Sequence, residues 1–160
     1  MNIRIALSND WANFREIRLV SIETDPQAFG GDLTEEKKRQ EPEWRNRLES
    51  NDQFFFVAED RGDFVSMAGA KKINDIWTLV GVYTRPIFRG KGFAQKLIEM
   101  IVVELKKRGV DTIQLIVNVD QKDAIHIYER VGFEIIKTIT GEKMSDGQFH
   151  DEYCMEKKLS

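Results

Sequence analysis

The sequence is poor in cysteine and has no long apolar run. Cys154 is the only cysteine among 160 residues, which excludes an internal disulfide and is typical of a reducing compartment. No segment is apolar enough to span a bilayer, and the first ten residues, MNIRIALSND, lack the apolar stretch of a signal peptide. We therefore expect a cytoplasmic protein that has no membrane partner.

The sequence also lacks an excess of positive charge and any set of metal ligands. It has 24 Lys and Arg residues and 27 Asp and Glu residues. The resulting formal net charge of -3 argues against a nucleic-acid partner. His126 and His150 have no neighbouring ligands, so we expect no metal site. Cys154 lies in the strand-like DEYCMEKKL and is expected to be a small apolar filler rather than a nucleophile.

What the sequence does contain fits one compact unit. A chain of 160 residues with 41% hydrophobic residues has the usual size of a single domain with one sizeable core. No internal repeat or low-complexity segment is present. We therefore expect one domain spanning residues 1–160.

The first half of the chain alternates strand and helix patterns and then becomes a strand meander. IRIAL predicts a strand, and residues 10–22 predict a helix capped by Asp10. After the loop DPQAFGGD, a second helix capped by Thr34 is expected to carry Trp44 and Leu48. Three strands follow, QFFFVAED, VSMAGAKKI and IWTLVGVYT, whose short connections predict antiparallel pairing.

The second half predicts a βαβ unit. Residues 94–105 place apolar side chains at helical spacing, and Gly109 ends the helix. TIQLIVN then has the continuous apolar character of a strand that is buried on both faces. A helix at about 121–131 and two strands joined across SDGQ complete an α/β fold with a mixed sheet.

The segment between the third strand of the meander and the next helix carries a basic, glycine-rich turn. Such a junction presents unpaired backbone N–H groups and the positive end of the helix dipole, and Gly90 and Gly92 allow a ligand to approach closely. The turn is therefore suited to hold an anion. The alternative is that these glycines only shape a tight turn while Arg89 and Lys91 are solvated.

Two familiar phosphate-binding loops do not fit this turn. A Walker A loop needs Ser or Thr after its Gly-Lys pair, but Gly92 follows Lys91, and Arg85 stands where the first Gly belongs. A dinucleotide fingerprint needs Gly or Ala at position 95, where this chain has Gln95. ATP and NAD are thus disfavoured as ligands.

The turn instead resembles the signature of the GNAT superfamily of acyl-CoA-dependent N-acetyltransferases. That signature is Gln or Arg, two residues, Gly, one residue, then Gly or Ala, which RGKGFA matches through Arg89, Gly92 and Ala94. A second stretch, LIVNVDQKDAIHIYERVGF, is similar to the family's following strand and helix, which end in Tyr-Glu-x-x-Gly-Phe. The resemblance extends over almost the whole chain, and these two motifs lie at the separation that the family shows.

The resemblance implies a mostly antiparallel sheet with helices on both faces and one parallel pair of strands, splayed to hold acetyl-CoA. It implies that backbone amides of the turn hold the CoA pyrophosphate, that the strand before it pairs with the pantetheine arm, and that Asn118 faces the slot. The expected cofactor-binding residues are Val82, Tyr83, Thr84, Arg89, Gly90, Lys91, Gly92, Phe93, Ala94 and Asn118. No metal is implied.

Tyr128 is the expected catalytic residue. An amine attacks the thioester directly in a ternary complex, and a Tyr hydroxyl can protonate the departing thiolate, whose thiol pKa is about 8.5. The N–H of Val82 is a candidate donor to the oxyanion. The general base stays open, because IWTLVGVYT has no carboxylate, and Asp75 and Glu23 both read as surface charges.

The resemblance implies an acetyl-CoA-dependent acyltransferase that acts on a primary amine of a small molecule or peptide. The acidic segments around the expected entrance, with Asp25, Asp32, Asp151 and Glu152, are suited to attract a cationic amine or are merely solvated. The alternative function is a non-catalytic module that senses acyl-CoA. Whether the chain forms a homodimer stays open.

Overall fold

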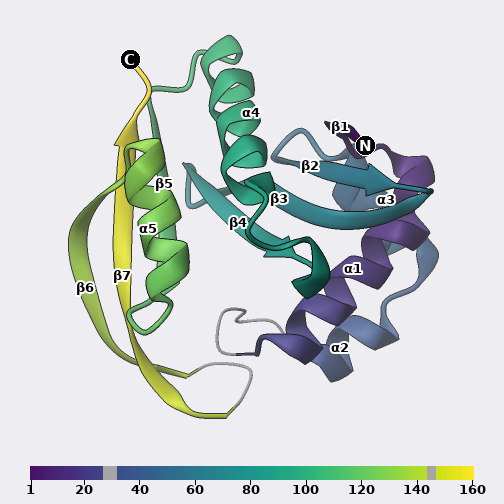
Figure 1. Cartoon of the computed structure of the whole chain (residues 1–160), viewed down its shortest axis with the longest axis horizontal. Helices are drawn as coiled ribbons and strands as arrows, with labels where there is room; N and C mark the ends of the chain where they lie inside the picture. Colours follow the sequence, from purple (N-terminus) through teal and green to yellow (C-terminus); the bar gives the residue numbers. More distant parts are fainter. Residues whose placement is uncertain (27–31, 144–146) are drawn as a thin grey trace.

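The computed structural model describes residues 1–26, 32–143 and 147–160. They form one seven-stranded sheet in the order β1-β2-β3-β4-β5-β7-β6 (Figure 1). The strands are β1 (Asn2–Ile5), β2 (Gln53–Asp60), β3 (Asp63–Ile73), β4 (Ile76–Thr84), β5 (Thr112–Asn118), β6 (Glu134–Lys143) and β7 (Phe149–Lys158). Neighbouring strands are antiparallel except β4 and β5, which run parallel. The mixed α/β sheet expected from the sequence is confirmed.

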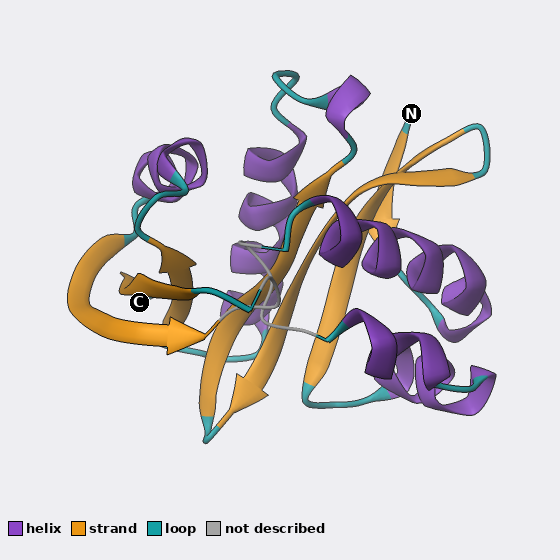
Figure 2. Ribbon diagram, turned by 90° about the horizontal axis from the view of Figure 1, so that it is seen from below, coloured by secondary structure: helices purple, strands orange, loops and turns teal. Residues whose placement is uncertain are grey.

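Helices cover both faces of the sheet (Figure 2). On one face lie α1 (Trp11–Thr24), α2 (Leu33–Lys38) and α3 (Glu41–Glu49), where Phe14, Ile17 and Trp44 pack against strand residues such as Phe55. On the other lie α4 (Phe93–Lys107) and α5 (Lys122–Val131), which form a second apolar cluster with the sheet. The sheet therefore separates two cores, and short 3₁₀ turns at Ser8–Asp10 and Pro86–Phe88 complete the connections.

The prediction of a single charged helix after the first loop is wrong, because the structure has two helices there. Arg39 and Gln40 are extended between α2 and α3, and Pro42 lies in the first turn of α3. Proline has no N–H to donate and is tolerated only in the first turn of a helix, so a continuous helix through position 42 is disfavoured. Asp32 rather than Thr34 caps α2, since its side chain accepts from the N–H groups of Thr34 and Glu35.

Asp10 precedes α1 as expected, but its side chain makes no capping hydrogen bond to that helix. Its carboxylate accepts from both terminal nitrogens of Arg4, at 2.7 and 2.9 Å, and from the N–H of Leu7. The predicted loop at 25–32 and the turn at 145–148 lie partly outside the described residues.

The parallel strands β4 and β5 separate soon after they meet. Their registered pairing consists of Thr78 with Gln114, although the strands are nine and seven residues long. Beyond that point the carboxyl-terminal halves of both strands have no partner on the shared side, among the described residues. The backbone polar groups of these two edges are thus available to a ligand that inserts between them.

The expectation that TIQLIVN is buried on both faces is wrong for one face. Ile113, Leu115 and Val117 are buried against α4 and α5, whereas Ile116 is 45% exposed on the opposite face. The helices α1, α2 and α3 pack over the β1–β4 part of the sheet and leave this face of β5 uncovered. Over the described residues, none of the helices is long and apolar enough to cross a membrane.

Candidate active site

A cleft of about 1210 Å³ lies where β4 and β5 separate. Its walls come from the second half of β4, the 85–92 turn, the start of α4, the end of β5 and one side of α5. It contains Tyr128 and nine of the residues predicted to contact the cofactor: Val82, Tyr83, Thr84, Arg89, Gly90, Gly92, Phe93, Ala94 and Asn118. Lys91 is outside this lining, and its Nζ lies 5.4 Å from the centre of the Phe88 ring.

The glycine-rich turn opens directly onto the N-terminus of α4. Gly92 is the N-cap residue with φ +84°, and no side chain caps the helix. The first N–H groups of a helix have no partner within it, so those at the start of α4 are available to an anion in the cleft. Arg89 folds back instead, since its Nε donates to the carbonyl oxygen of Thr84 at 2.8 Å. Together these features form a positively polarised pocket made mainly of backbone.

An irregularity in β4 faces the same cleft. Met67 pairs with Tyr83 and Gly69 pairs with Val80, so Gly81 and Val82 together oppose the single residue Ala68. Gly81 has φ +61°, a conformation that other residues adopt only with strain. Such a bulge interrupts the ladder and redirects backbone groups. It therefore frees backbone polar atoms of β4 beside the opening.

Asn118 brings an unsatisfied donor to the cleft. The residue is 2% exposed at the end of β5, and its Oδ1 accepts the N–H of Asp120 at 2.8 Å. Its Nδ2 is the one buried side-chain nitrogen or oxygen without a hydrogen-bond partner in the described parts of the chain. An unpaired buried amide is unfavourable by about 1–3 kcal/mol, so the fold alone does not account for it. A ligand carbonyl in the cleft would satisfy this donor.

Tyr128 reaches the cleft from α5 and is 8% exposed. Its ring packs edge-on against Phe133, with the ring centres 6.1 Å apart. Burial raises the pKa of the hydroxyl, and the negative charge of Asp25 raises it further. The hydroxyl therefore keeps its proton throughout the neutral range, as a proton donor must.

The acidic residues expected at the entrance are distributed differently. Asp25 and Glu152 line the cleft, whereas Asp32 caps α2 and Asp151 accepts the N–H of Gly141 at 3.1 Å. Asp75 and Glu23, considered as bases from the sequence, are absent from the lining. Arg18 of α1 also lines the cleft, although the helix pattern carries no signal for such a role.

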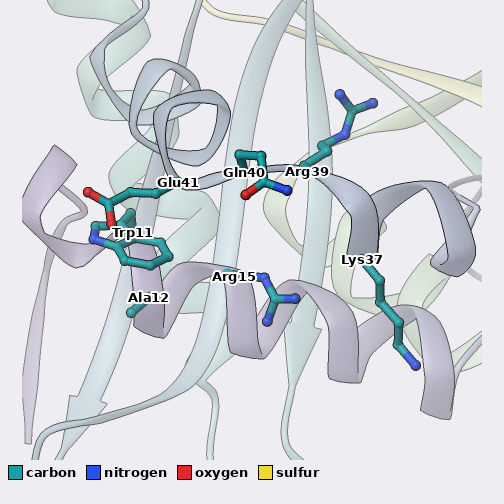
Figure 3. Close-up of a pocket in the computed structure, with 7 residues that line it drawn as sticks. All are labelled: Trp11, Ala12, Arg15, Lys37, Arg39, Gln40 and Glu41. Carbon is teal, nitrogen blue, oxygen red and sulfur yellow. The ribbon is translucent and has the colours of Figure 1, made fainter.

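A second hollow, of about 510 Å³, lies between the start of α1 and the α2–α3 connection (Figure 3). It is lined by Trp11, Ala12, Arg15, Lys37, Arg39, Gln40 and Glu41. It is more open than the cleft, and it contains none of the motif residues. The cleft between β4 and β5 is therefore the candidate active site.

The described residues offer neither a reactive thiol nor a cluster of metal ligands. Cys154 is buried on β7, and burial raises the pKa of its thiol, which disfavours the reactive thiolate. Within residues 1–26, 32–143 and 147–160, no group of three His, Cys, Asp or Glu side chains is arranged to hold a metal ion.

Comparison with known proteins identifies the family. Residues 15–133 match the model of the acetyltransferase (GNAT) family, and the chain belongs to that family. Among named relatives, YjgM of Escherichia coli, an uncharacterised N-acetyltransferase, is 33% identical over 91 residues, 54% of each chain. The [ribosomal protein bS18]-alanine N-acetyltransferase of Escherichia coli is 32% identical over 78 residues, 49% of this chain and 53% of that protein. The chain thus spans about half the length of these relatives.

The fold is shared with solved structures of low sequence identity. The structure of yncA, a putative acetyltransferase from Salmonella typhimurium with its cofactor acetyl-CoA, has a TM-score of 0.85 at 18% identity. The match covers 100% of this chain and 94% of that one. The GNAT resemblance of the two sequence motifs is confirmed by the family match and by this fold.

Proposed function

We propose that the chain is an N-acetyltransferase that moves an acetyl group from acetyl-CoA to a primary amine of a small molecule or peptide. The observation that carries the proposal is the cleft between the separated strands β4 and β5, which has the glycine turn at one end and Tyr128 and Asn118 inside it. Family membership and the named N-acetyltransferases among the relatives support the same activity.

Each part of the cleft has a role in this proposal. The backbone N–H groups at the start of α4 hold the pyrophosphate, and the unpaired edge of β4, from Val82 to Thr84, pairs with the pantetheine arm. Asn118 donates its free Nδ2–H to a carbonyl of that arm. Acetyl-CoA supplies a thioester whose carbonyl carbon can be attacked by an amine.

Two groups act on the reaction itself. The bulge at Gly81 and Val82 positions the N–H of Val82 as a donor to the developing oxyanion. The buried hydroxyl of Tyr128 donates its proton to the leaving thiolate. Both groups lie in a cleft that is partly shielded from water, where such interactions are stronger than at the surface.

The experiment that tests the function is thiol release from acetyl-CoA across a panel of amines. The panel holds an alanyl-terminated peptide, a lysine-containing peptide with a blocked N-terminus, spermidine and free amino acids, because relatives and neighbours include a ribosomal-protein-alanine and a spermidine N-acetyltransferase. With at least one of these amines, the rate of thiol release from acetyl-CoA should rise with the amine concentration. Tight CoA binding without thiol release from acetyl-CoA in the presence of any of these amines would instead favour the acyl-CoA sensor.

CoA and acetyl-CoA should raise the melting temperature, whereas ATP and NAD should not. A ligand that binds only the native state at 100 times its dissociation constant stabilises by about 2.7 kcal/mol, which is roughly 5–10 °C for a chain of this size. The failed Walker A and dinucleotide motifs predict no shift for the other two nucleotides. Equal shifts from all four, measured by thermal denaturation, would contradict a CoA site.

Gly92→Ala should weaken CoA binding by about tenfold or more, which corresponds to about 1.4 kcal/mol or more. A Cβ at Gly92 would meet no protein atom within 4 Å, so it would enter open space beside the N-terminus of α4. The positive φ adds strain of roughly 1–2 kcal/mol to the folded state.

Gly109→Ala is the matched control, because Gly109 has φ +75° and equally open surroundings but follows the far end of α4. Both variants should lose similar stability, and only Gly92→Ala should lose CoA affinity by calorimetric titration. Equal dissociation constants for the two variants would limit the glycine to a structural role.

A further inference from the structure

The end of α1 is fixed at the wall of the cleft. Thr24, its last residue, forms a hydrogen bond of 2.9 Å between its Oγ1 and the hydroxyl of Tyr83 on β4. Tyr83 is 3% exposed and lines the cleft itself. Asp25 follows Thr24 immediately, so this contact holds Asp25 at the cleft, whose wall it lines.

Asp25 is poorly placed for stability. Its N–H closes the last turn of α1 by bonding to the carbonyl oxygen of Ser21 at 3.0 Å, so its negative charge lies at the negative end of the helix dipole. Its carboxylate accepts no hydrogen bond and forms no ion pair among the described residues. Partial burial raises the pKa of the carboxyl, and Arg89 offsets part of this effect. A carboxylate in a cleft that does not stabilise the fold is a candidate for a functional residue.

Asp25 and Tyr128 approach the opening from opposite faces of the sheet. Tyr128 belongs to the core formed with α4 and α5, whereas Tyr83, which holds the end of α1, belongs to the core on the other face. The charge of Asp25 nevertheless acts on the Tyr128 hydroxyl, so the two groups are within electrostatic reach of each other across the opening. A reacting carbonyl between them would have a base on one side and an acid on the other.

We propose that Asp25 is the general base of the acetyl transfer, accepting a proton from the acceptor ammonium directly or through one water. This inference rests on the proposed N-acetyltransferase activity and assigns the base that the sequence left open. A carboxylate on β4 is not required, because α1 supplies one from across the cleft.

The proton balance is complete with these two groups. The ammonium gives one proton to Asp25, and the nitrogen lone pair then forms the new bond to the thioester carbon. As the carbon–sulfur bond breaks, the sulfur takes the proton of Tyr128, and the nitrogen loses a second proton that restores the Tyr128 hydroxyl. Of the three ammonium protons, one stays on the amide, one ends on the thiol, and one leaves to solvent through Asp25.

The other carboxylates that line the cleft are Asp123 and Glu152. Asp123 lies exposed in the first turn of α5, where the helix dipole already stabilises its charge. Glu152 lies on β7 opposite Asn118, on the side of β5 away from β4. Among the other ionisable groups of the cleft lining, Arg89 acts on the Asp25 carboxyl and Asp25 acts on Tyr128. The rest of the lining carries Arg18, Lys71, Tyr83, His126, Arg130 and Lys143. Asp25 is thus the carboxylate on the α1 side of the opening.

Asp25→Asn should lower kcat/KM at pH 7 by about 10²–10⁴-fold with the fastest amine of the panel. Because an alkylamine has a pKa near 10.4, the free amine becomes available without a base as pH rises, so the deficit should shrink between pH 7 and pH 10. Glu23→Gln, which removes an exposed carboxylate two residues earlier, should match the parent. If Asp25→Asn kept the kcat/KM of the parent at pH 7, or if Glu152→Gln lost activity instead, the assignment of Asp25 would be overturned.

A second readout does not need turnover. A carboxyl whose folded pKa is raised contributes stability that is present below its unfolded pKa of about 3.9 and is lost as pH rises through the folded value. Asp25→Asn should therefore melt higher than the parent at pH 7.5, and the difference should vanish toward pH 3.5, whereas Glu23→Gln should show no such trend. A lower melting temperature for Asp25→Asn at pH 7.5 would make the residue structural.

The two readouts separate the possible failures. A parent that turns over no amine in the panel removes the proposed function, and the role of Asp25 falls with it even if the stability difference appears. A parent that turns over an amine, with Asp25→Asn equal to it at pH 7, removes only Asp25 from the mechanism.

Discussion

Tyr128→Phe lowers kcat by about 10²–10⁴-fold while the apparent affinity for the amine and for CoA holds. The substitution removes one hydroxyl, which has no hydrogen-bond partner among the described residues, and keeps the ring that packs on Phe133. Fold and melting temperature should therefore be unchanged. The loss falls on the transition state alone, where the hydroxyl protonates the leaving thiolate.

The measurement is thiol release from pH 6 to pH 10 with an active amine. Because burial raises the pKa of Tyr128, the hydroxyl stays protonated over this range, and the deficit should persist throughout it. Tyr153→Phe is the matched control, since Tyr153 is a partly buried tyrosine of β7 outside the cleft lining. Parental turnover of Tyr128→Phe across the range would remove this residue from the mechanism.

Glu36→Gln is expected to destabilise the chain by about 2–3 kcal/mol. Glu36 is 7% exposed, and its carboxylate accepts two hydrogen bonds from Arg47, at 2.9 and 3.2 Å. Its oxygens also lie 3.4 Å from Nε of Arg39 and 3.9 Å from Nη2 of Arg18, whose pKa burial lowers. Breaking a fully buried pair is worth about 3–5 kcal/mol, and we expect less here because Arg39 remains partly in water.

Urea denaturation measures this loss, with Glu35→Gln as the control. Glu35 pairs with Lys38 at 3.4 Å on the surface of the same helix, and such an exposed pair is worth less than about 1 kcal/mol. Equal free energies of unfolding for the two variants would show that the contacts of Glu36 with its arginines stabilise the chain no more than a surface ion pair does.

Local patterns predicted most of the elements, because each depends on neighbouring residues. The strands β2, β4 and β5 occupy the residues expected from their apolar runs, and α4 ends before Gly109 as expected. The break between α2 and α3 was missed because the charged residues around Pro42 look helical until the first-turn preference of proline is applied.

The sequence motifs predicted the residues of the cofactor cleft, and the acidic segments predicted Asp25 and Glu152 near its entrance, but not the contacts that position them. The glycine turn and Tyr128 follow from two contiguous stretches of sequence, and the structure brings them to one cleft. Asp25 reaches the same cleft through the Thr24–Tyr83 contact, which joins residues 59 positions apart. The buried unpaired amide of Asn118 likewise depends on how β5 meets β7 and α5, so no sequence pattern could reveal it.

The most direct test of acetyl transfer at this cleft uses acetyl-CoA whose acetyl group carries deuterium. The parent chain is incubated with the labelled thioester and each amine of the panel. Mass spectrometry then gives the masses of the products, and a thiol assay gives the amount of free thiol. Acetyl transfer at this cleft should place one labelled acetyl group on the amine for every thiol released, and Tyr128→Phe should be slower by at least about a hundredfold. Bound thioester that stays intact with every amine, or thiol release without a labelled amine, would contradict it.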